Sequence, residues 1–195
     1  MNLLLGLSRL IDALTERVGR AARWLILVMV LISAGNALAR YALNLSSNAW
    51  LEVQWYLFSA VFLVCAGYAL KHNQHVRVDV VASRFSPRAQ ACIEIFGTLF
   101  FLLPMAVLIL TLSWPVFADS WRSGEISANA NGLHLWPARM LVPLGFALLV
   151  LQGLAELIKR IAFLTGHAPD PGEKPDAGAM QRELADAILK SRRES

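Results

Sequence analysis

The stretch that decides the fold is IFGTLFFLLPMAVLILTLSWPVFA, residues 95–118, which contains no charged side chain. It is longer than the roughly 18 apolar residues that make a run a candidate transmembrane helix. The whole chain shares this character, because 56% of its 195 residues are hydrophobic, 16% are charged and the mean hydropathy is +0.51. This composition excludes a soluble domain, a disordered chain and a nucleic-acid module. Cys65 and Cys92 lack the spacing of a metal site or a disulfide framework, and we interpret both as small core residues.

Three further runs resemble this one. Residues 24–39 are uncharged. Residues 53–70 are also uncharged, and aromatic side chains typical of a membrane interface lie at the start of this run. The last run begins near Trp136 and ends before Lys159. Only a short polar link separates the first two runs, which indicates an antiparallel hairpin. We therefore predict an all-α membrane protein with one membrane domain at residues 1–165 and four transmembrane helices at about residues 22–43, 49–70, 88–121 and 136–159.

The ends of the third helix carry specific signals. Ser86 is a suitable N-cap, and Pro87 suits the first helical position because its missing N–H has no partner there. Pro104 lies near the middle and predicts a kink, since it cannot donate to the carbonyl four residues earlier. Gly124 predicts a left-handed C-terminal cap.

The basic residues decide the predicted orientation. The net charge is +4, but the cations lie beside the apolar runs and form no stripe for nucleic acid. Of the 18 Lys and Arg residues, all except Arg40, Arg122 and Arg139 fall on one side of the four-span pattern. The positive-inside rule therefore predicts that both termini are cytoplasmic.

The two terminal segments are polar in different ways. Before the first run, apolar side chains recur at helical spacing between charged ones: Leu3, Leu7, Leu10, Ile11, Leu14 and Val18. No basic start precedes them, as it does in a signal peptide. We expect an amphipathic helix at about residues 3–20, lying on the cytoplasmic surface or against a partner. Residues 166–195 are rich in Pro, Gly and charge and predict a flexible cytoplasmic tail.

Ionisable side chains are candidate sites because they are costly inside a membrane. Glu52, Glu94 and Glu156 all fall near the ends of predicted spans, where a carboxylate reaches the interface or pairs with a neighbouring helix. Arg40 and Glu52 should lie at a similar depth across the hairpin. They are candidates for a salt bridge or a shared hydrogen-bond network, or for contact with a partner protein.

The inner loop holds the densest polar group. His75, Arg77 and Asp79 alternate with valines, so that their side chains share one face of an extended segment. We favour a charge-paired connector docked at the cytoplasmic interface. A metal site formed by His72, His75 and Asp79 is the weaker alternative, because no fourth ligand is evident.

The outer loop is the other candidate region. Trp121 and Trp136 belong to an interfacial aromatic belt, and Glu125 lies between them. Two readings stay open: Glu125 and the polar residues after it meet a periplasmic partner, or the loop is a solvated turn that holds the last two spans together.

These loops resemble a known family. The segments HVRVD at residues 75–79, SGEIS at 123–127 and NGLHLWP at 131–137, in this order on a four-span pattern, are similar to the small membrane subunit of tripartite ATP-independent periplasmic (TRAP) transporters, the DctQ-like small permease. The similarity extends over about residues 24–160.

The resemblance implies a function without catalysis. It implies a bacterial inner-membrane complex in which a periplasmic binding protein delivers a small organic anion, typically a carboxylate, to a large subunit driven by a sodium gradient. The small subunit would then be a scaffold that braces the large elevator-type subunit. No cofactor is implied in this chain, because sodium is expected to bind the large subunit. For Glu52, His75, Arg77 and Asp79 the resemblance implies a structural or docking role.

Two other functional classes fit these residues less well. A four-helix haem carrier requires paired histidines within the spans, and His72, His75, His134 and His167 all lie outside the apolar runs. A small self-sufficient cation exporter requires a deep carboxylate, and Glu52 lies near the end of its span.

Overall fold

The computed structural model describes residues 2–44, 48–72, 85–129 and 131–169. Its elements are α1 (Asn2–Leu43), α2 (Asn48–Lys71), α4 (Pro87–Gly97), the π-helical turn η1 (Thr98–Leu102), α5 (Leu103–Ser123) and α6 (Trp136–Leu164). Four stretches are long and apolar enough to cross a membrane: Leu3–Leu43, Asn48–Lys71, Pro87–Ser123 and Trp136–Leu164. The prediction of an all-α protein with four spans is confirmed. The cytoplasmic location of the termini stays a prediction.

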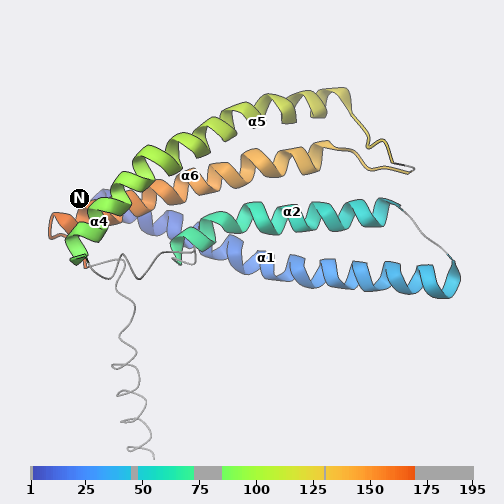
Figure 1. The fold of residues 1–195 in the computed structure, drawn as a ribbon, viewed down its shortest axis with the longest axis horizontal. Coiled ribbons are helices and arrows are strands. Elements are labelled where there is room, and N and C mark those ends of the chain that lie inside the picture. The colour runs from blue at the N-terminus through green and yellow to red at the C-terminus, as the bar shows by residue number, and fades with distance from the viewer. Residues whose placement is uncertain (1, 45–47, 73–84, 130, 170–195) are drawn as a thin grey trace, which may run out of the picture.

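The helices form an array in which α6 is central. It packs against α1, α2 and α5, whereas α5 packs mainly on α6 (Figure 1). Half of the buried residues in the described chain therefore lie on α6, among them Leu149, Gln152 and Ala155. The large apolar side chains of the other helices point outward, as expected where lipid is the solvent.

Glycines allow the closest helix contact. A Cβ added at Gly145 on α6 would lie 2.8 Å from the Leu63 carbonyl oxygen on α2, and one added at Gly67 would lie 3.4 Å from the Leu148 carbonyl oxygen. Small residues at such crossings are typical of membrane helices, whose association depends on close packing. The backbones of α2 and α6 thus approach each other closely around these positions.

The third span has the predicted ends but a different middle. The Ser86 hydroxyl accepts from the Ala89 N–H at 3.4 Å, and Pro87 lies in the first turn, as predicted. Gly124 caps the other end with a left-handed φ of 62°, which is also confirmed. Before Pro104 the helix widens into η1, where the Leu103 N–H bonds to the Thr98 carbonyl five residues earlier. The kink at Pro104 stays a prediction, and a π-helical turn is itself a common place for a helix to kink.

One prediction about a single residue was wrong, and one about a helix face stays a prediction. Residues 2–43 form one continuous helix, and its first part turns Ser8, Ile11 and Thr15 toward the bundle while Leu3 is 84% exposed. Whether the exposed leucines lie on a membrane surface stays a prediction. Cys92 is exposed, so its assignment to the core was wrong, because α4 packs only along one side. The predicted tail from residue 170 onward lies outside the described residues.

Candidate functional site at the two ends of the helix array

Glu52 is the centre of a polar network at one end of the array. We call this end the outer end, and the opposite end the inner end, after the predicted orientation. Its side chain is only 6% exposed, although it lies in the first turns of α2. One carboxylate oxygen accepts from the Asn129 side-chain amide at 2.7 Å and from the Ser127 hydroxyl, and the other accepts from the Leu133 backbone N–H at 2.7 Å. The carboxylate of one helix thus binds three donors from the loop that joins two others.

The loop is folded so that these donors converge. Ile126 and His134 form an isolated antiparallel bridge, and the Ser127 N–H donates to the Leu133 carbonyl at 2.9 Å. The turn between them is closed by a hydrogen bond from the Gly132 N–H to the Asn129 carbonyl at 2.9 Å. A Cβ on Gly132 would lie 2.6 Å from the Ser127 carbonyl oxygen, so that only glycine fits this tight turn.

Two further contacts flank Glu52. Glu125 and Arg139 form a two-pronged salt bridge at 2.5 and 3.1 Å, which joins the end of α5 to the start of α6. Trp121 and Trp136 meet edge to face, with ring centroids 4.5 Å apart. The structure therefore brings Glu52, Trp121, Glu125 and Trp136 together at one end of the array, with a closed loop as their common element.

Arg40 does not take the place that we expected. The hypothesis of a salt bridge with Glu52 is not realised, because loop donors surround the carboxylate and Arg40 lies exposed on α1. The sequence could show that both residues lie near the outer ends of adjacent helices. It could not show how the loop after Gly124 folds back over α2.

A second polar network ties α1, α2 and α6 at the inner end. Gln152 is fully buried; its carbonyl accepts from the Thr15 hydroxyl at 2.7 Å, and its amide donates to Asp12 at 2.8 Å and to Glu156 at 3.1 Å. Lys159 then bridges the same two carboxylates, at 3.2 Å from Asp12 and 2.6 Å from Glu156. Each acidic group in this network is held by at least one donor.

The same inner network continues onto α2. Lys71 lies 2.7 Å from the Glu16 carboxylate and donates to the Asp12 carbonyl at 3.2 Å. His72 approaches the same Glu16 oxygen at 3.1 Å. His72 is thus placed in an ion-pair network, and the described residues contain no group of His, Cys, Asp and Glu that could hold a metal ion.

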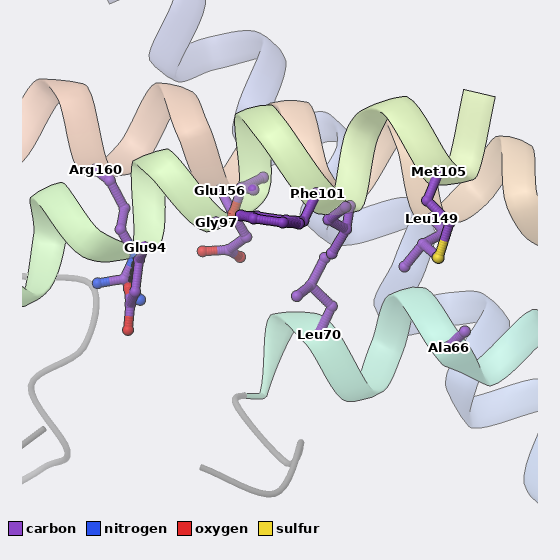
Figure 2. Close-up of a pocket in the computed structure, with 11 residues that line it drawn as sticks. Ala66, Leu70, Glu94, Gly97, Phe101, Met105, Leu149, Glu156 and Arg160 are labelled. Atoms are coloured by element: carbon purple, nitrogen blue, oxygen red, sulfur yellow. Dashed lines mark ion pairs between the residues drawn. The ribbon is translucent and has the colours of Figure 1, made fainter. Parts of the chain in front are cut away.

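An apolar groove with a charged end lies between α2, α5 and α6. It measures about 490 Å³, and Figure 2 shows Leu70, Phe101 and Met105 along its walls. Glu94 and Arg160 form an ion pair at its inner end. The predicted interhelical pairing is observed for Glu94, whose partner Arg160 lies on α6, whereas Glu156 pairs with Lys159 on its own helix.

Sequence reasoning missed most of the inner network. It described the first helix through its apolar residues and assigned no contacts to Asp12 or Glu16. A usable signal was present on the last helix, where Gln152, Glu156 and Lys159 follow one another at spacings of four and three and so share a face. His75, Arg77 and Asp79 lie outside the described residues, and their predicted roles stay predictions.

At both ends of the array, the polar side chains connect helices and loops to one another. The carboxylates of Asp12, Glu52 and Glu94 accept hydrogen bonds from, or form ion pairs with, groups on other elements. A protein-family model described as "Tripartite ATP-independent periplasmic transporters, DctQ component" matches residues 29–163. That range includes Glu52, the outer loop and Arg160, whereas Asp12 and Glu16 precede it. No curated protein and no solved structure matched the chain.

Proposed function

Because the chain belongs to the DctQ component family of tripartite ATP-independent periplasmic transporters, we propose that it is the scaffold subunit that braces the large elevator-type subunit in the bacterial inner membrane. The family is one of transporter components and not of enzymes. In this proposal the large subunit uses a sodium gradient and holds the sodium ions. A periplasmic binding protein delivers a small organic anion with a carboxylate. Both termini of the present chain are cytoplasmic, as its distribution of Lys and Arg indicates.

The proposal rests on the positions of the acidic side chains and on the groups that bind them. Glu52 at the outer end, and Asp12 and Glu94 at the inner end, are bound by donors from other elements. A group that couples ion movement to transport has to change partners during the cycle, whereas these groups join helix ends to one another. A fixed array is what a bracing subunit requires, because a transport domain that slides inward pushes back on its support.

Reconstituted transport tests the proposal. The soluble binding protein is first screened with a panel of carboxylates by thermal shift, and the radiolabelled hit is then used with proteoliposomes. We expect uptake only when the small subunit, the large subunit, the loaded binding protein and an inward sodium gradient are all present. Uptake by the small subunit alone would refute the proposal and favour the self-sufficient exporter class. Full uptake by the large subunit without this chain would refute the bracing role.

A further inference from the structure

A groove between α1 and α2 interrupts the surface that faces the bilayer. It measures about 530 Å³ and lies along the outer halves of the two helices. On α1 its lining includes Ser33, Ala34 and Ala37, and on α2 it includes Gln54 and Trp55. The small side chains of α1 leave a concave strip, where another helix could approach closely.

The same side of α1 carries polar groups. Ser33, Asn36 and Arg40 are separated by three and four residues and therefore lie along one face of the helix. Gln54 adds an amide from α2 on the opposite wall. Within residues 2–44, 48–72, 85–129 and 131–169, none of these four side chains has a hydrogen bond or an ion pair to another residue.

Unpaired polar groups are unusual at this position. Ser33 and Asn36 lie well inside the predicted span at residues 22–43, where no water is available, so polar side chains in membrane helices normally face protein. The other side of α1 shows the contrast, since Leu27, Leu31 and Leu38 are exposed there and suit lipid tails. A hydrocarbon chain offers no donor or acceptor to the polar strip, and a polypeptide does.

We propose that this α1–α2 groove is the surface on which a transmembrane helix of the large subunit docks, an inference that rests on the proposed function. The matching helix has small residues at the crossing, an amide or hydroxyl facing Asn36 and Gln54, and a carboxylate near the outer interface for Arg40. A second copy of this chain fits poorly, because an isologous contact over this strip brings Arg40 close to its own copy. The groove in Figure 2 is a weaker candidate, because its Glu94–Arg160 and Glu156–Lys159 pairs are formed within the chain.

Site-specific photo-crosslinking in the co-expressed complex tests the surface directly. A benzophenone amino acid replaces Ala37 in the groove or, as the control, Leu31 on the opposite side of the helix. We expect the probe at position 37 to give a product with the combined mass of the small and large subunits, and the probe at 31 to give little. A product only at position 31, a product with twice the mass of this chain, or no protein product at position 37 would each overturn the inference.

Co-purification with a tagged small subunit tests how strongly the large subunit binds to this surface. We expect Ala37→Leu and Arg40→Ala each to lower the amount of recovered large subunit by about fivefold or more. Gly35→Leu is the matched control, because a Cβ at Gly35 has no atom within 4 Å, and it should recover the wild-type amount. Gel filtration of each free variant separates lost docking from lost folding. Wild-type recovery by a folded Ala37→Leu variant would refute this surface alone, whereas no large subunit recovered by the wild type would refute the proposed function as well.

Discussion

Replacing Gly145 with alanine should loosen the array where α6 lies against the backbone of α2. The added Cβ would lie 2.8 Å from both the Cβ and the carbonyl oxygen of Leu63, whereas ordinary contact begins at 3.4 Å, so the two helices must separate locally by about 0.6 Å. The obstacle is the backbone of α2, which cannot rotate away as a long side chain does. Overpacking of this kind costs about 1–3 kcal/mol. The intrinsic helix preference of alanine offsets little, because α6 stays helical in lipid even when it is not packed.

The change is measured by unfolding in mixed micelles with increasing SDS, followed by tryptophan fluorescence and far-UV circular dichroism. We expect Gly145→Ala to lower the folded-to-unfolded ratio about 5–150-fold, which corresponds to about 1–3 kcal/mol. Gly67→Ala is a graded control with its nearest atom at 3.4 Å, and Gly35→Ala is a control facing open space. Both should stay within about 0.5 kcal/mol of the wild type. If Gly145→Ala unfolds at the same SDS fraction as Gly35→Ala, α2 and α6 do not approach as closely as the structure indicates, and the reasoning fails.

Three further changes probe the two polar ends. Glu52→Gln should keep the loop near α2 but weaken it, because a neutral amide accepts less strongly from three donors, and limited proteolysis of the outer loop should become faster; an unchanged rate would contradict the role of Glu52 as its anchor. Gln152→Ala should cost about 1–3 kcal/mol in the same SDS titration, because it leaves buried polar groups without their partner, and a neutral result would show that water replaces the amide. Arg139→Ala should cost less than about 1 kcal/mol, because its salt bridge with Glu125 is partly exposed, and its small effect should shrink further at high salt.

The sequence was sufficient for the helices but not for their contacts. Charged residues interrupt the apolar runs sharply, so that the predicted second span at residues 49–70 differs from Asn48–Lys71 by one residue at each end. Gly124 was equally predictable, because a helix that stops at a glycine has a common left-handed cap. These signals depend only on neighbouring residues, so they can be recognised without knowledge of the fold.

The partners of Glu52 show why the rest could not be predicted. They are more than 70 residues away in the chain, and they meet it only because a turn at Gly132 aims a backbone N–H and two side chains at one carboxylate. The first part of α1 shows a second reason. An amphipathic pattern marks two faces but does not say which one packs inward, and in lipid the face with Ser8 and Thr15 packs against the bundle while the leucines remain outside.

The position of the polar networks bears on how a bracing subunit resists load. Because α5 packs mainly on α6, it could pivot about that single contact if nothing else held it. Glu52 ties the loop beyond α5 to α2 at the outer end, and the Arg160–Glu94 pair ties α6 to α4 at the inner end. Two attachments at opposite ends of a helix fix its angle, which one attachment at the middle cannot do. Among the residues that the structure describes, the side-chain bonds between helices gather at these two ends. In our proposal, groups such as Asn36 therefore remain between the two ends to bind a neighbouring subunit within the membrane.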